Sequence, residues 1–151
     1  MTRPFQFRLE RVRALRERAE DQAREELASS LAIRMRGEAM LRAAAETVEG
    51  ARDARRQSSV EDLSGADLRA MNAYLERTQR ERESAELELD RRAAEVDARR
   101  ATLVARSQER QVLERLKERR QAEHQREADR VEGALLDEIA IVGHRRAEAA
   151  S

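Results

Sequence analysis

Histidines and carboxylates are the side chains of this sequence that could transfer protons or bind a metal ion. The two histidines, His124 and His144, lie 20 residues apart, and neither belongs to a known metal-ligand or catalytic spacing. The 31 acidic residues fall mainly on predicted helix faces, where nothing would raise a carboxyl pKa into the range of a general acid. The sequence also has no cysteine, no glycine-rich phosphate loop and no nucleophile elbow. We therefore predict a protein that is not an enzyme, with no catalytic residue, no metal site and no cofactor.

The charge composition narrows the classes of partner. The 31 basic residues balance the 31 acidic residues, so no net field would draw the chain to nucleic acid or to an anionic membrane. The N-terminus has no apolar segment of the length that a signal peptide needs, and no run of about 18 apolar residues could span a bilayer. We expect a soluble cytoplasmic protein that does not bind nucleic acid.

The longest element that would position functional residues is a helix predicted over about residues 64–143. His124 falls on one seam of a seven-residue repeat in this stretch, where a polar residue that sets the register is favoured over a metal ligand. At about 1.5 Å per residue the helix would be about 120 Å long, so it needs a long partner. A chain with 41% charged and 2% aromatic residues is typical of coiled coils. The apolar residues on that seam are Leu68, Leu75, Leu89, Val96, Leu103 and Val131.

The first third of the chain is predicted to be this partner, as a helix over about residues 3–56 in which Pro4 occupies the first turn. Its apolar residues recur at a mean step of about 3.6 residues, which predicts weak supercoiling with a stutter. The turn is predicted at about residues 57–63, because Ser64 and Asp67 resemble a capping box at the start of the second helix. The predicted fold is all-α: a single-domain, long antiparallel two-helix coiled-coil hairpin.

The second predicted helix extends past the first. With the turn near residue 60, Phe5 would lie opposite about Arg115, which leaves about 25 residues, or roughly 40 Å, of protruding C-terminal helix. Gly143 is predicted to stop this helix, and residues 144–151 are expected to form a frayed tail. The protruding part keeps an apolar stripe, which needs a partner in water. The stripe consists of Ala128, Val131, Leu135, Ile139 and Val142.

Segments near both ends of the chain resemble one known family. Residues 5–12 (FQFRLERV), followed by residues 15–17 (LRE), are similar to the opening of the FliJ family of flagellar export proteins. Residues 113–120 (LERLKERR), and Glu132 with residues 136–140 (LDEIA), look like that family's basic-acidic run and closing Asp-Glu signature. The resemblance covers the whole chain in architecture and about a dozen specific residues.

The resemblance implies a role in the flagellar type III export apparatus. FliJ proteins are antiparallel two-helix coiled coils that resemble the central stalk of rotary ATPases and insert into the hexameric export ATPase, FliI. They also contact the cytoplasmic domain of the export gate protein, FlhA, and help to recycle export chaperones. For this chain the resemblance implies a stalk that promotes assembly of the ATPase hexamer and couples it to the gate, at the inner face of the cytoplasmic membrane.

The resemblance also implies two partner surfaces. Tyr74 and Leu75 correspond in placement to an aromatic-aliphatic pair that the family uses toward the export gate, although Ala44 and Thr47 depart from the bulkier residues that line the tip in many relatives. For the aromatic residues at both surfaces, packing within the hairpin is the alternative. The residues implied for the ATPase surface are Phe5, Phe7, Leu135, Leu136, Asp137, Glu138 and Ile139.

Two other functions stay open. A purely structural coiled-coil spacer or tether would use the same seam and would have no ATPase partner. A nucleic-acid-binding hairpin would need a face of one charge sign, and this interpretation ranks last. Glu114 and Glu118 interrupt the basic cluster that consists of Arg115, Lys117, Arg119 and Arg120.

Overall fold

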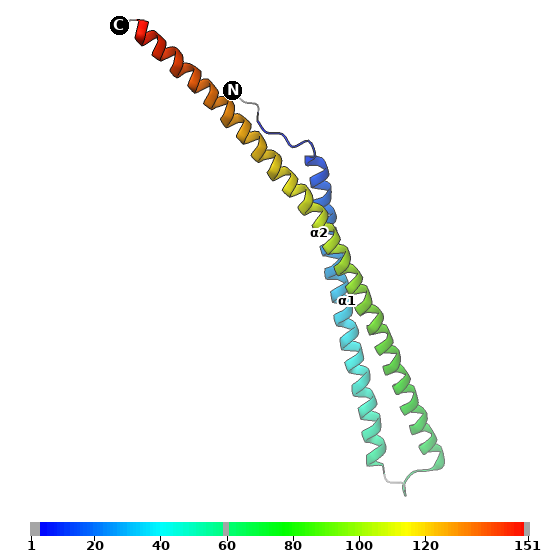
Figure 1. The fold of residues 1–151 in the computed structure, drawn as a ribbon. Helices are drawn as coiled ribbons and strands as arrows, with labels where there is room; N and C mark the ends of the chain where they lie inside the picture. Colours follow the sequence, from blue (N-terminus) through cyan, green and yellow to red (C-terminus); the bar gives the residue numbers. More distant parts are fainter. Residues whose placement is uncertain (1–3, 59–60, 150–151) are drawn as a thin grey trace. The chain divides into compact units, whose positions relative to one another are not determined.

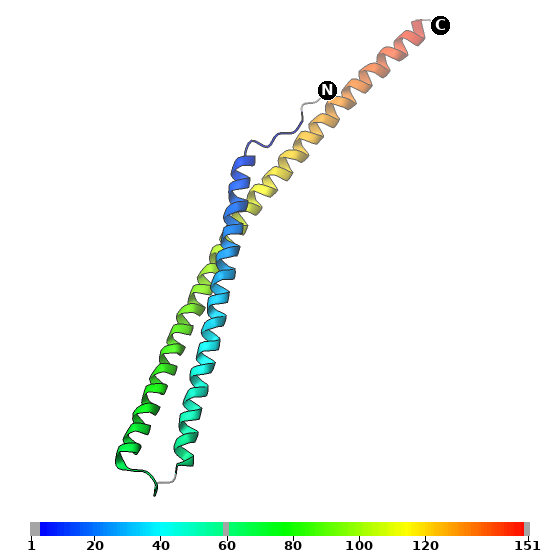
Figure 2. The same ribbon diagram turned by 180° about the vertical axis from the view of Figure 1, so that it is seen from behind.

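The computed structural model describes residues 4–58 and 61–149. It contains two helices, α1 (Glu10–Gln57) and α2 (Gly65–Ala149), and no strand within the described ranges. Figure 1 shows the two helices and the single connection between them, and Figure 2 shows the same elements from behind. The predicted all-α class, a hairpin of two long helices, is confirmed.

The contacts divide the chain into two units. One unit combines the residues up to Ala19 with those from Arg106 onward, and the other is Glu20–Ala105. That the chain forms one domain stays a prediction.

The start of α2 has the predicted capping box. The amide of Asp67 donates to Ser64 Oγ at 3.2 Å, and the amide of Ser64 donates to Asp67 Oδ2 at 3.0 Å, so two amides without helical acceptors are satisfied. The hydroxyl and amide of Ser64 together lower the pKa of the Asp67 carboxyl. The connection between the helices comprises residues 58–64, one residue later than predicted, and Ser59 and Val60 lie outside the described residues.

The predicted start of the first helix at about residue 3 is wrong, because α1 begins at Glu10. Residues 4–7 have no regular structure, and the Glu10 amide donates to the Phe7 carbonyl at 3.1 Å. Phe5 and Phe7 are both half-buried. Residues two apart point to roughly opposite sides of a helix but to the same side of an extended chain, so a non-helical segment allows both side chains to be partly covered.

The position of Phe5 along α2 also differs from the prediction. Its ring lies against His124 and not opposite Arg115. One reason is that Glu26 and Arg99 face each other, which places the midpoint of the hairpin between residues 62 and 63 and not at residue 60. The other is that an extended residue advances about 3.3 Å, against about 1.5 Å in a helix.

The predicted helix stop at Gly143 is wrong as well, because α2 continues to Ala149. Gly143 has no positive φ, so it does not form the left-handed cap that a glycine stop requires. The residues after it favour a helix, and His144 Nε2 lies 3.4 Å from Glu148 Oε1, one turn away. Helical propensity beyond Gly143 therefore outweighs a glycine penalty of about 1 kcal/mol. Of the predicted tail, Ala150 and Ser151 lie outside the described residues.

The buried face of α1 follows a strict seven-residue repeat, and the predicted 3.6-residue step with a stutter is wrong. Glu20 and Val48 occupy one seam position, while Ala23, Ser30 and Gly37 occupy the other. A pattern based on apolar residues alone did not identify this seam, because most of its buried residues are small or polar. Met35, which belonged to the apolar pattern, is 67% exposed.

The seam of α2 is the predicted one between Leu68 and His124. Thr78 and Val96 are buried at the two predicted seam positions, and the seam residues between these two are half-buried. Arg99 also lies on this seam and bonds to Glu26 of α1 at 2.6 Å and to Glu95 of its own helix at 2.7 Å. Arg99 is therefore accommodated on the seam by one carboxylate from each helix.

Candidate partner-binding site

The N-terminal segment packs against α2 within the unit formed by residues 4–19 and 106–149. The ring centroids of Phe5 and His124 are 5.7 Å apart with an interplanar angle of 60°, within the range of favourable aromatic pairs. Phe5 and Phe7 line an open groove together with Leu116 and Arg120. Phe5 thus has a packing role inside the chain, and its contact with a partner protein stays a prediction.

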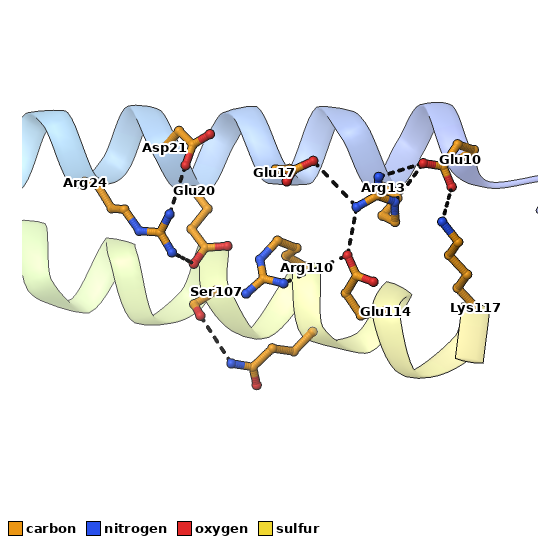
Figure 3. A network of polar contacts seen from close by, with 11 residues as sticks. Glu10, Arg13, Glu17, Glu20, Asp21, Arg24, Ser107, Arg110, Glu114 and Lys117 are labelled. Atoms are coloured by element: carbon orange, nitrogen blue, oxygen red, sulfur yellow. Dashed lines mark hydrogen bonds and ion pairs between the residues drawn. The ribbon is translucent and has the colours of Figure 1, made fainter. Parts of the chain in front are cut away.

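A charged network joins the first turn of α1 to α2 (Figure 3). Arg13 donates to Glu10 Oε1 at 2.6 Å and, through Nη1, to Glu114 Oε1 at 2.8 Å. Lys117 Nζ donates to the other Glu10 oxygen at 3.0 Å. Hydrogen bonds from Arg13 and then Lys117 lower the pKa of Glu10 from 4.5 to about 2. Such charge-assisted bonds are stronger and more directional than neutral ones, and this network ties the first turn of α1 to Glu114 and Lys117 of α2.

The last turns of α2 carry the apolar surface that sequence analysis predicted. Every described residue from Ala134 to Ala149 is exposed. Leu135, Ile139 and Val142 lie on one side of the helix, and an exposed apolar patch of this kind marks an interaction surface. We call the shallow groove on this side the C-terminal groove; its lining residues are Leu135, Glu138, Ile139, Val142, Gly143 and Arg146.

The structure distributes the predicted ATPase residues over different sides of α2. Leu135, Glu138 and Ile139 line the C-terminal groove. At about 100° per residue, Leu136 lies to the flank of Leu135, and Asp137 lies roughly opposite it. One flat partner surface would therefore contact the groove residues and would not reach Asp137.

The predicted aromatic residues do not join this groove. Phe5 pairs with His124, which precedes Leu135 by about 16 Å of helix. The residues predicted to form one ATPase surface therefore lie in two separate regions, one around Phe5 and Phe7 and one around Ile139.

Tyr74 and Leu75, the residues predicted for the export gate, belong to the Glu20–Ala105 unit. The Tyr74 side chain is 43% exposed, and the guanidinium carbon of Arg77 lies 5.3 Å from its ring centroid, a cation–π distance. Leu75 is half-buried on the seam. Of the two, Tyr74 is available to a partner and Leu75 packs within the unit.

Sequence reasoning missed two features of these surfaces. It did not identify His124 as the ring that receives Phe5, since no local pattern reveals a contact between residues so far apart. It also left Gly143 and Arg146 out of the C-terminal surface. The repeat contained that signal, because Arg146 follows Ile139 by seven residues and so lies on the same side of the helix.

Neither a membrane span nor a metal cluster was found in the described part of the chain. None of its helices is long and apolar enough to cross a bilayer. Residues 4–58 and 61–149 include no group of three or more His, Asp or Glu side chains that could hold a metal ion.

Comparison with known proteins places the chain in one family. No curated protein and no solved structure matches it. The family model described as Flagellar FliJ protein matches residues 5–149. This range includes the Phe5 segment, the connection and the whole C-terminal groove. Because the match extends over nearly the entire sequence, the chain belongs to the FliJ family of flagellar export components.

Proposed function

We propose that this protein is the stalk that binds the hexameric export ATPase, a FliI-like protein, and promotes its assembly and activity. The observation that carries the proposal is the C-terminal groove, where Leu135 and Ile139 are exposed at the end of a long helix. An apolar helix face of this kind is suited to insertion into a complementary groove or ring of a partner. Family membership supports the export ATPase as that partner.

The mechanism proposed for the stalk is mechanical and involves no catalytic residue. Binding of the helix to several ATPase subunits would favour the hexamer over free subunits, because a ligand stabilises the state to which it binds. Tyr74 would contact the cytoplasmic domain of an FlhA-like export gate, with Leu75 holding that part of α2 in place. The protein would act in the cytoplasm, peripherally at the membrane-bound export machinery, and would also take part in recycling export chaperones.

The experiment that tests this function is ATP turnover by the purified export ATPase of the same organism, with and without the protein. Hexamer formation is scored in parallel by sedimentation. Stimulated turnover together with more hexamer is the expected result. If the ATPase neither binds the protein nor responds to it, the stalk proposal fails, and the structural spacer or tether becomes the function to pursue.

A further inference from the structure

The apolar side of α2 changes after His124. Up to that residue the seam toward α1 repeats every seven residues, and the same repeat would continue at Val131 and Glu138. Leu135 and Val142 instead lie four residues after these two positions, which rotates them by about 40° around the helix. The C-terminal groove therefore includes one position of that repeat, Glu138, while its apolar residues lie to one side of the repeat.

The groove has the same spacing when it is read in either direction. Its lining residues follow one another at steps of 3, 1, 3, 1 and 3 residues from Leu135 to Arg146. A two-fold axis between Ala140 and Ile141 would therefore place Ile139 across from Val142 of a second copy, and Leu135 across from Arg146. Every face of an α-helix has this spacing, so the geometry permits a two-fold interface and the charges beside the groove decide whether it is favoured.

The charges beside the groove indicate the direction of the second helix. Glu138 and Arg145 form no ion pair within the described residues, although most of the chain is rich in such pairs. In the antiparallel arrangement Arg145 of one copy lies beside Glu138 of the other, and the aliphatic stem of Arg146 covers Leu135. A parallel arrangement would instead place Arg146 beside the same arginine of the second copy, which is repulsive.

We propose that a second copy of this chain docks antiparallel on the C-terminal groove, with Ile139 packed on Val142 and Glu138 paired with Arg145. This interface does not depend on the proposed export function. It does overlap the surface proposed for the ATPase, since both use Leu135 and Ile139. Self-pairing and ATPase binding would therefore exclude each other, and the pair would keep the apolar face covered until the ATPase is present.

The first test is sedimentation velocity of the full chain over a range of concentrations, without any ATPase. We expect a monomer–dimer equilibrium for the natural sequence. Ile139→Ser should lower the association constant at least about tenfold, because it removes the central apolar contact. The matched control is Ile141→Ser, since Ile141 is 53% exposed against 60% for Ile139 and lies on the far side of the helix. Circular dichroism verifies that both variants stay helical.

The second test exchanges the charges. Glu138→Arg alone and Arg145→Glu alone should each weaken self-association, because each places like charges together. An equimolar mixture of the two variants should form a mixed dimer, since both of its pairs are again opposite in sign. A natural chain that stays monomeric up to its solubility limit would overturn the proposal, as would equal losses for Ile139→Ser and Ile141→Ser or a mixture no better than its components. None of these results depends on ATPase stimulation, so the two proposals fail separately.

Discussion

Arg92 of α2 lies directly over Gly37 of α1. A Cβ atom at Gly37 would be 3.2 Å from both Cδ and Nη1 of Arg92, and Nη1 donates to the Ile33 carbonyl at 3.3 Å. The missing side chain at Gly37 is what lets a charged residue occupy a seam position. Gly37 is accordingly buried, although glycine is a poor helix former.

Filling the space at Gly37 should destabilise the protein. Gly37→Leu would force Arg92 out of the seam, and overpacking of this kind costs about 1–3 kcal/mol. Gly50→Leu is the matched control, because nothing lies within 4 Å of a Cβ at that position, and it should stabilise α1 by up to about 1 kcal/mol. Urea unfolding followed by circular dichroism measures both. Equal effects of the two substitutions would show that Arg92 does not depend on the space at Gly37.

The Glu10 network should make part of the stability depend on pH. Arg13 and Lys117 hold the pKa of Glu10 at about 2 in the folded chain, against an ordinary value of 4.5. A depressed carboxyl pKa stabilises the folded state above the unfolded-state value, and that contribution is lost as the pH falls from about 4.5 toward 2. Glu10→Gln should therefore reduce the loss of thermal stability in this pH range. Glu25→Gln, at an exposed position of α1, should leave the pH profile unchanged, and a profile that is equally unchanged by Glu10→Gln would contradict the prediction.

The contact between Phe5 and His124 should hold the N-terminal segment on α2. Phe5→Ala removes an aromatic pair worth about 0.5–1.5 kcal/mol beyond its buried area. We expect faster hydrogen exchange at the amides of Glu10 and Arg13, which bond to the Phe7 and Leu9 carbonyls. Gln6→Ala changes an exposed neighbour and should leave these exchange rates as they are. If both variants exchange alike, the ring contact does not hold this segment.

Substitutions in the C-terminal groove test the proposed ATPase surface without altering the rest of α2. The double substitution Leu135→Ser/Ile139→Ser should abolish stimulation of the export ATPase while circular dichroism shows an unchanged helix, because both residues are exposed and removing them costs little stability. Ile141→Ser should retain stimulation. Retained stimulation in the double variant would move the ATPase contact away from the C-terminal groove.

Replacing Tyr74 or Leu75, the two residues proposed for the export gate, by alanine should affect stability and gate binding differently. Tyr74→Ala is expected to change the free energy of unfolding by less than about 0.5 kcal/mol, because Tyr74 is 43% exposed and lies outside the buried seam, yet to weaken binding to the cytoplasmic domain of the export gate. Leu75→Ala should lower stability, since Leu75 packs on the seam. Tyr74→Phe keeps the ring and should keep binding. Unfolding curves and a pull-down of the gate domain distinguish these effects, and full gate binding by Tyr74→Ala would exclude Tyr74 from the contact.

The sequence by itself determined the features that depend on neighbouring residues and on long periodicity. The capping box of Ser64 and Asp67 is a local pattern, and so is the seven-residue repeat from Leu68 to His124, because residues at fixed spacing along one helix share a side whatever their partner. The apolar stripe around Leu135 and Ile139 was predictable for the same reason. These patterns sufficed for the all-α class and for the exposed C-terminal surface.

Only the tertiary structure decided which residues oppose one another. The irregular form of residues 4–7 accompanies the packing of Phe5 on His124 of α2, more than 100 residues later in the chain. The seam of α1 could not be read from hydrophobicity, because Glu20, Ser30 and Gly37 are buried there. Whether a polar or absent side chain is favourable at a seam depends on what faces it, and for Gly37 that is Arg92. The free energy of burying such a residue depends on both members of the opposing pair, and the sequence pattern of one helix contains only one of them.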